Sequence, residues 1–442
     1  MELDKNTLAD LSIFNKGGDF SIFEHLNYTH TTGGRDQLRR LFNNPLKSIS
    51  AIQNRQETLR FILENIDRWP GKINNGAVMV IEKFLAPTAE SIPLDNGPFA
   101  GLHGLYYRLF LYEAYSVIRY SIDHLFTFLK SMDELVHLFS EEDLPDLFEK
   151  QIKNAAGLLS RKEIRSFLKV RSRGKITITK TMQYGHFLKH RHGGSIEKLL
   201  EIYYRLDAWY SMALAGKKLG FSFPKLVEEE EPVLQLDQLF HPLLEEPVAY
   251  DVKLNEHTNF LFLTGANMAG KSTFIKAIGV AVYLAHLGMG VPARQMHLTL
   301  FEGILSNIQV QDNIFKGESY FYNEVQRIKK TVLKINNRKK WLILIDELFK
   351  GTNFQDAKQC SEMVIEGLLK MKSNLFVLST HLYEIAESLE VHENIAFRYF
   401  ETAVENEEPK YSYQLKEGIS NDRLGFLILK RERVLELLKR IE

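Results

Sequence analysis

The chain has 442 residues, which is more than one ordinary domain. Its 56 basic side chains balance 56 acidic ones, so the net charge does not point to any particular partner, such as a nucleic acid or a membrane. A single cysteine, Cys360, excludes an intrachain disulfide framework, and no apolar run is long enough to span a membrane. Because the N-terminus is polar and has no signal peptide, we expect a cytoplasmic protein without membrane contact.

The first half of the chain, residues 1–230, predicts an α-helical domain. Apolar residues recur there at helical spacing, as Leu38, Leu41 and Phe42 do. Longer periodic segments follow at 105–129 and 199–219. This half is therefore expected to consist of helices, with little β structure.

Within this half, residues 161–191 form a basic segment. It has ten Lys or Arg residues and one acid, Glu163. The alternation over 175–180 predicts a short strand or a hairpin arm. Clustered cations of this kind can neutralise nucleic-acid phosphates, so the segment is a candidate DNA-binding surface. The residues proposed for that contact are Arg171, Arg173, Lys175 and Lys180.

An acidic, proline-bearing run at 228–232 marks the expected domain boundary. After it, short apolar tracts alternate with helical patterns. Continuous apolar tracts of strand length stand at 260–263, 341–345 and 375–378, and alternating tracts follow at 395–400 and 411–415. Strands separated by helical patterns predict a mostly parallel sheet covered on both faces. Residues 231–442 are thus expected to form an α/β domain.

Residues 265–272 form a complete G-x-x-x-x-G-K-[ST] phosphate loop between a predicted strand and a predicted helix. Its glycines let backbone N–H groups surround phosphates at the positive end of the helix. Lys271 can reach the terminal phosphates, and the Ser272 hydroxyl can bind Mg²⁺. The pattern predicts a site for a nucleoside triphosphate.

Acidic and imidazole side chains follow two later strands of the same domain. Asp346 and Glu347 end the strand over 341–345, where an ATPase needs one acid for the metal and one to activate water. His381 follows the strand over 375–378, which places it for contact with the γ-phosphate. We therefore expect Lys271, Glu347 and His381 to be catalytic, and Ser272 with Asp346 to hold Mg²⁺.

The ordered motifs of this half resemble the ATPase domain of the MutS family of DNA mismatch repair proteins. The resemblance lies in four motifs: the inner Asn267-Met268 of the phosphate loop, the V-P-A turn that ends at 293, the D-E-x-x-x-G-T pattern over 346–352 and the T-H strand end. The resemblance implies a P-loop ATPase domain of ABC-like fold that uses ATP and Mg²⁺. The residues implied to bind nucleotide are Gly265, Ala266, Asn267, Met268, Ala269, Gly270, Lys271, Ser272 and Thr273.

Residues 312–324 resemble the family's signature loop, which in relatives enters the nucleotide site of the partner subunit. The resemblance thus implies that Ser319 contacts ATP in trans, and that the protein is a homodimer with composite ATP sites. Upstream, residues 31–56 and 206–243 resemble the start and the return of the family's helical lever domain. The mismatch-reading and connector domains of the family are expected to be absent.

The leading hypothesis is a DNA-binding ATPase of the MutS family. The alternative is a nucleotide-gated protein scaffold or regulatory switch that has the ATPase half and does not bind DNA. A transporter-type ATPase is disfavoured, because no LSGGQ-like signature precedes Asp346.

Overall fold

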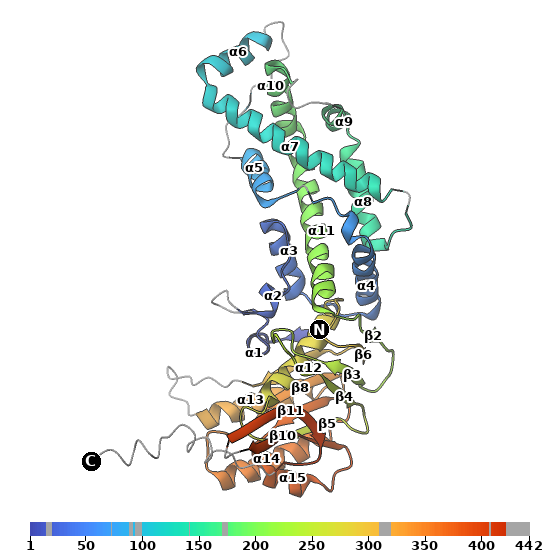
Figure 1. Cartoon of the computed structure of the whole chain (residues 1–442), viewed down its shortest axis with the longest axis vertical. Coiled ribbons are helices and arrows are strands. Elements are labelled where there is room, and N and C mark those ends of the chain that lie inside the picture. The colour runs from blue at the N-terminus through green and yellow to red at the C-terminus, as the bar shows by residue number, and fades with distance from the viewer. Residues whose placement is uncertain are drawn as a thin grey trace, which may run out of the picture. The chain divides into compact units, whose positions relative to one another are not determined.

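The computed structural model describes residues 1–14, 20–71, 73–87, 92, 100–140, 142–169, 176–308, 320–405 and 408–420. The chain divides into two compact units (Figure 1). Unit 1 comprises Met1–His25, Asn44–Gln53 and Gly216–Glu442, and unit 2 comprises Leu26–Asn43 and Asn54–Ala215. Residues 1–25 thus belong to the same unit as the phosphate loop.

Unit 1 is built on a seven-stranded sheet of order β1-β7-β8-β9-β5-β10-β11. All neighbours from β1 to β10 pair in parallel, and only β10 and β11 are antiparallel. The apolar tracts predicted as strands are confirmed as β5, β8, β9, β10 and β11. The strands are β1 (Glu2–Leu3), β5 (Phe260–Thr264), β7 (Gly303–Asn307), β8 (Trp341–Asp346), β9 (Leu375–Ser379), β10 (Ile395–Glu405) and β11 (Glu408–Glu417).

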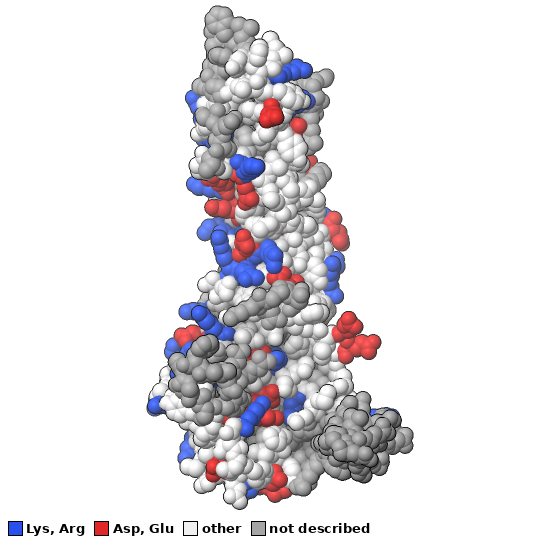
Figure 2. Space-filling view, turned by 90° about the vertical axis from the view of Figure 1, so that its left-hand side faces the viewer, with Lys and Arg blue, Asp and Glu red and all other residues white. Residues whose placement is uncertain are grey.

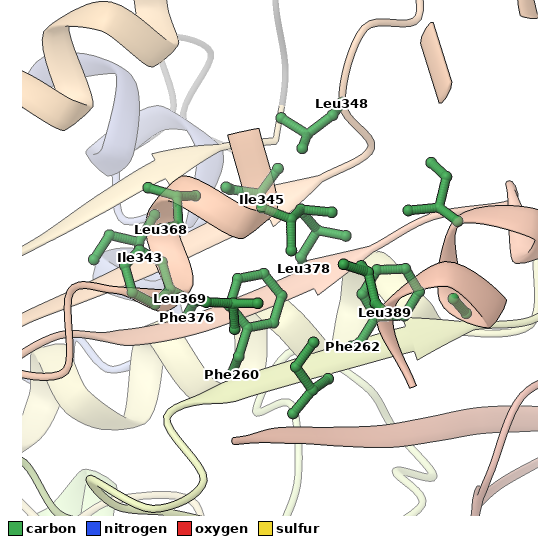
Figure 3. Packing of buried hydrophobic residues seen from close by; sticks show 14 of the residues in the cluster. Phe260, Phe262, Ile343, Ile345, Leu348, Leu368, Leu369, Phe376, Leu378 and Leu389 are labelled. Atoms are coloured by element: carbon green, nitrogen blue, oxygen red, sulfur yellow. The ribbon is translucent and has the colours of Figure 1, made fainter. Parts of the chain in front are cut away.

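Helices cover both faces of this sheet, as predicted, because side chains alternate between the faces along each strand. On one face Phe260, Ile343 and Phe376 pack in a cluster with side chains of three helices (Figure 3). On the other face Leu344 approaches Gly279, where an added Cβ would come within 2.7 Å of it. The helices are α13 (Tyr320–Ile335), α14 (Phe354–Leu369) and α15 (Tyr383–Leu389) on the first face and α12 (Lys271–His286) on the second.

A second sheet in unit 1 was not predicted from the sequence. Its order is β2-β6-β3-β4, with β2 and β6 parallel and the other pairs antiparallel. Its short strands lie in the segment that precedes the phosphate loop and in the one that follows α12. They are β2 (Lys225–Leu226), β3 (Leu234–Leu239), β4 (Tyr250–Leu254) and β6 (Gln295–Leu298), and the short helices α1 (Lys5–Asp10) and α2 (Ile22–His25) complete the unit.

Every regular element in the described part of unit 2 is a helix, as the periodicity predicted. Aromatic side chains fill part of its core, and the rings of Phe139 and Phe148 meet edge to face at a centroid distance of 5.3 Å. The first residues of α4, up to Gln53, and the last residues of α11, from Gly216, are counted with unit 1. The elements are α3 (Thr32–Asn43), α4 (Ile49–Glu64), the 3-10 helix η1 (Ile66–Arg68), α5 (Asn75–Leu85), α6 (Ala100–Phe110), α7 (Tyr112–Leu138), α8 (Asp146–Leu159), α9 (Lys162–Leu168), α10 (Ile178–His186), the π-helical turn η3 (Phe187–Arg191) and α11 (Gly193–Leu219).

The buried carboxylate of Asp207 in α11 fastens the start of α3. It accepts hydrogen bonds from the backbone N–H of Thr31 at 3.0 Å and from the Thr31 hydroxyl at 2.8 Å. That hydroxyl in turn accepts one from the backbone N–H of Gly34, as a helix N-cap does. Residues 31–34 and 207, which come from the two lever-like segments of the sequence, thus lie together within unit 2.

The expectation of a strand or hairpin arm over 175–180 is wrong for its described part. Thr177 caps helix α10 by accepting a hydrogen bond from the backbone N–H of Lys180, and the helix runs from Ile178. Alternation over so few residues does not separate a strand from the first turn of a capped helix. Lys180 is consequently an exposed residue of a helix.

Candidate active site

The phosphate loop joins the carboxyl end of β5 to the amino end of α12. Gly265 and Gly270 have φ values of 134° and 104°, a region that favours glycine, and Gly270 directly precedes the helix. A Cβ at Gly265 would lie 3.2 Å from the Phe400 carbonyl oxygen. Asn267 and Met268 are exposed in the middle of the loop. This strand-loop-helix arrangement directs backbone N–H groups at an anion.

Lys271 is nearly buried and bends back over the loop. Its Nζ donates hydrogen bonds to the carbonyl oxygens of Gly265, at 2.6 Å, and Ala266, at 2.9 Å. Burial lowers the pKa of Lys271, while the carboxylates of Glu347 and Asp346 act in the opposite direction. The ammonium group is therefore held inside the loop that would enclose phosphates.

Ser272 and Asp346 are in direct contact, although 73 residues separate them in the chain. The Ser272 hydroxyl donates a hydrogen bond to Asp346 Oδ2 at 2.5 Å. Asp346 Oδ1 accepts another from the hydroxyl of Ser379, its partner in the parallel pairing of β8 and β9. A hydroxyl beside a carboxylate fits the protein's share of a Mg²⁺ site, in which phosphate and water oxygens supply the remaining ligands.

Glu347 lies directly after β8 with a left-handed backbone, φ 66°, and its N–H donates to the Ser379 carbonyl oxygen at 2.9 Å. Its carboxylate oxygens lie 3.4 Å from His381 Nδ1 and 3.2 Å from Lys350 Nζ. Burial alone would raise the pKa of Glu347, but the hydrogen bond with His381 and the charge of Lys350 outweigh it and lower that pKa to about 2. Glu347 is thus an ionised acceptor, held in an unusual conformation of the kind found at functional sites.

Glu324, in α13, was not predicted as a site residue. It is buried, and its two carboxylate oxygens accept hydrogen bonds from the backbone N–H groups of Lys350 and Gly351, at 3.2 and 3.3 Å. Burial raises the pKa of Glu324, although the two backbone hydrogen bonds act to lower it. The helix that follows Ser319 in the chain therefore fastens the loop that follows Glu347. A polar residue on the apolar face of a helical pattern is the one sequence signal that could have pointed to it.

Two further side chains were missed. The sequence pattern places Ser379 only at a strand end, and its contact with Asp346 depends on which strands are neighbours. Tyr413 in β11 lies beside the end of the phosphate loop, since its ring would be 3.4 Å from a Cβ at Gly270. An aromatic ring at that position offers a flat face on which a base can stack.

Several predicted residues lie outside the described part of the chain: Ser319, Arg171, Arg173 and Lys175. Within it, the remaining residues predicted to bind ATP or Mg²⁺ all belong to unit 1, whereas Lys180 belongs to unit 2. In the described part no group of three or more His, Cys, Asp or Glu side chains is placed to hold a metal ion. Nor does any helix there have the length and apolar character needed to cross a membrane.

Comparison with known proteins matches two families of domains. The family model "MutS domain V" matches residues 261–436, which include the whole candidate site, and "MutS domain III" matches residues 6–75. MutS domain V is the ATPase domain of these proteins, in keeping with the α/β architecture of unit 1.

Named relatives agree with these matches. The chain is 27% identical over 263 residues to the DNA mismatch repair protein MutS of Petrotoga mobilis, a match that covers 58% of this chain and 32% of that protein. It is 28% identical over 240 residues to the DNA mismatch repair protein spellchecker 1 of Drosophila melanogaster (51% of this chain, 25% of that protein) and 29% identical over 245 residues to the human MutS protein homolog 4 (53% and 25%). The matches span a third or less of these relatives' length. With both domain models and these relatives in agreement, the chain belongs to the MutS family.

Proposed function

We propose that this protein is a Mg²⁺-dependent ATPase that works as a homodimer with composite ATP sites and acts on DNA. One observation carries the proposal. The phosphate loop leaves the carboxyl end of β5, and Lys271 and Ser272 begin the helix that follows it. Asp346, Glu347 and His381 stand at or just after the carboxyl ends of β8 and β9, the next strands of the parallel sheet, and meet these residues there. Ligands of open α/β sheets bind at this edge.

ATP binding falls to the phosphate loop and the first turn of α12. Backbone N–H groups of residues 265–273 surround the phosphates at the positive end of the helix. Lys271 exchanges the carbonyl oxygens of Gly265 and Ala266 for phosphate oxygens. Those carbonyls hold the ammonium inside the loop, so the charge that would bind the phosphates is already at the site.

Ser272 and Asp346 hold Mg²⁺, which when bound neutralises charge on the phosphate oxygens. The direct Ser272–Asp346 hydrogen bond supports this assignment, because it shows that the two oxygens can approach a common point. Ser379 keeps the Asp346 carboxylate oriented through its own hydrogen bond. A hydrogen bond from a neighbouring side chain fixes the direction in which a metal ligand points.

Glu347 orients the attacking water and accepts its proton, and His381 contacts the γ-phosphate. The place of Glu347 directly after Asp346, at the carboxyl end of β8, supports the first role, and its carboxylate is ionised at neutral pH and so can accept a hydrogen bond from the attacking water. The exposure of the His381 side chain supports the second, because its ring is accessible from solvent beside Glu347. Positioning and electrostatics supply most of the rate enhancement in such phosphoryl transfer.

Ser319 completes the ATP site of the partner subunit. Support for this composite site comes from the family membership and from the likeness of residues 312–324 to the family's signature loop. Turnover per chain then depends on protein concentration, falling where the dimer dissociates.

DNA binding is supported by the names of the relatives and by the basic segment at 161–191. A specific observation favours the second candidate, a nucleotide-gated scaffold that does not bind DNA. Two cations of the segment have partners within unit 2: Arg161 donates to the Ser195 hydroxyl, and Arg165 lies 3.4 Å from Asp133. On the face drawn in Figure 2, basic and acidic side chains are interspersed.

The first test is ATP hydrolysis by Lys271→Ala, with Lys372→Ala, an exposed lysine of unit 1, as the control. Only Lys271→Ala should lose turnover. Unchanged hydrolysis by this variant would contradict the assignment of the ATP site. The second test is binding to duplex, mismatched and branched DNA over a range of salt, with charge reversal at Arg171, Arg173, Lys175 and Lys180. Binding that weakens with salt and with these reversals supports the DNA-binding ATPase. Absence of salt-dependent binding supports the scaffold.

A further inference from the structure

The loop that follows β8 has an unusual backbone. Glu347 and Phe349 both adopt left-handed conformations, with φ values of 66° and 58°. Residues other than glycine rarely adopt this region, and they keep it only where surrounding contacts hold them there. The contacts that hold this loop therefore decide where the Glu347 carboxylate points.

The sheet holds the first part of the loop. The backbone N–H of Glu347 donates a hydrogen bond to the Ser379 carbonyl oxygen in β9, at 2.9 Å. The next two side chains, Leu348 and Phe349, are buried in the hydrophobic cluster on the face of the sheet that α13, α14 and α15 cover (Figure 3). Glu347 is thus fixed from the side of the strands.

Helix α13 holds the second part of the loop. The Glu324 carboxylate accepts hydrogen bonds from the backbone N–H groups of Lys350, at 3.2 Å, and Gly351, at 3.3 Å. Three residues earlier in α13, the ring of Phe321 lies 5.6 Å from the ring of Phe349, centroid to centroid. Glu324 is only 1% exposed, and each of its oxygens accepts from the loop backbone, so it acts through the loop.

Lys350 connects this helix contact with the Glu347 carboxylate. Its backbone is held by Glu324, while its Nζ lies 3.2 Å from Glu347 Oε2. The Lys350 side chain is 35% exposed, and a long, partly exposed lysine by itself holds a carboxylate weakly. A fixed backbone limits the region that the ammonium group can reach. The position of Glu347 therefore depends on Glu324 through the residues between them.

We propose that Glu324 is a positioning residue for Glu347: by holding the backbone of Lys350 and Gly351, it fixes the loop from which the Glu347 carboxylate meets the attacking water. This inference rests on the role proposed above for Glu347. Glutamine at position 324 has one acceptor oxygen and a donor NH₂ group, so only one of the two backbone N–H groups keeps its partner. A small displacement of a catalytic group can lower the rate about a hundredfold.

The first measurement is steady-state hydrolysis by full-length Glu324→Gln. We expect kcat to fall about tenfold or more and KM for ATP to stay within about threefold, because the phosphate loop keeps its own contacts. Glu366→Gln, the same substitution at an exposed position of α14, is the matched control and should change neither constant. An unchanged kcat in Glu324→Gln, a loss confined to KM, or an equal loss in Glu366→Gln would overturn the proposal.

A double-mutant cycle with Glu347→Gln separates positioning from general destabilisation. If Glu324 acts through Glu347, adding Glu324→Gln to Glu347→Gln should slow hydrolysis by less than about twofold further. Single-turnover phosphate release, followed over hours, measures the low residual rates. Two losses that multiply would show that Glu324 acts independently of Glu347, which contradicts the proposal.

Failure of this positioning role and failure of the proposed function give different results. Wild-type turnover of Glu347→Gln alone would show that the role proposed for Glu347 is wrong. If Glu347→Gln is slow and Glu324→Gln is as fast as the wild type, only the role of Glu324 is wrong. Should Glu324→Gln fail to fold, Glu324→Asp, whose charged group is withdrawn from the loop by one methylene group, enters the same cycle with the same expected result.

Discussion

The imidazole of His381 and the carboxylate of Glu347 lie 3.4 Å apart, and each follows a different strand of the sheet in unit 1. Lys350, three residues after Glu347, contacts the other carboxylate oxygen. Glu347 is therefore held from both sides and kept ionised, which is the state needed by a residue that accepts a proton from water.

Glu347→Gln should bind ATP with nearly unchanged affinity and hydrolyse it about 10²–10⁴-fold more slowly, because the amide keeps the shape but cannot accept a proton. Nucleotide binding is measured by equilibrium titration and turnover by phosphate release. Glu366→Gln, on the same unit in α14, is the control and should be active. A Glu347→Gln protein with wild-type turnover would show that another group activates the water.

The pH profile of turnover should change when the partners of Glu347 are removed. In the wild type its pKa of about 2 leaves the carboxylate ionised throughout the range from weakly acid to neutral pH. In His381→Ala combined with Lys350→Met, the hydrogen bond and the charge that lower this pKa are lost, so the pKa rises and the acid limb of the profile moves to higher pH. Rates measured at saturating ATP from about pH 5 to pH 8 test this. Identical profile shapes would contradict the electrostatic role of the two residues.

Gly34→Ala should destabilise unit 2, because its Cβ would lie 2.1 Å from the buried Asp207 Oδ2. Displacing that carboxylate from the start of α3 is expected to cost about 1–3 kcal/mol of unfolding free energy. Gly157→Ala in α8 is the matched control, since nothing lies within 4 Å of its Cβ position. There the substitution should stabilise by about 0.5–1 kcal/mol. Urea denaturation measures the change in unfolding free energy of each variant. The same change in both would contradict the steric argument.

His30 gives unit 2 a pH-dependent stability. The Asp207 carboxylate lies 3.1 Å from His30 Nδ1, and this hydrogen bond raises the pKa of His30 above its ordinary 6.5. Partial burial acts in the opposite direction and is outweighed. The stabilisation is therefore complete below pH 6.5 and is lost as pH rises through the folded-state pKa. The difference in urea midpoint between wild type and His30→Gln should be larger at about pH 6 than at about pH 8.5. An equal difference at the two pH values would contradict this role of His30.

The local pattern of residues was enough to predict the phosphate loop, the strands that carry Asp346 and His381, and the helical character of unit 2. Each of these depends on neighbours in the chain: glycines where φ is positive, apolar tracts of strand length, and helical periodicity. A motif such as the one ending at Lys271 carries its own geometry, because the strand, the loop and the helix are consecutive.

Packing in three dimensions decided the remaining features. Ser379 reaches Asp346 only because β8 and β9 are neighbours in the sheet. Asp10 meets Arg327, and Asp207 meets Thr31, across 316 and 175 intervening residues, and no periodicity records such pairings. The spacing of apolar residues in the sequence predicts which side chains are buried. The order of the strands and the docking of the helices determine which partner each buried side chain contacts.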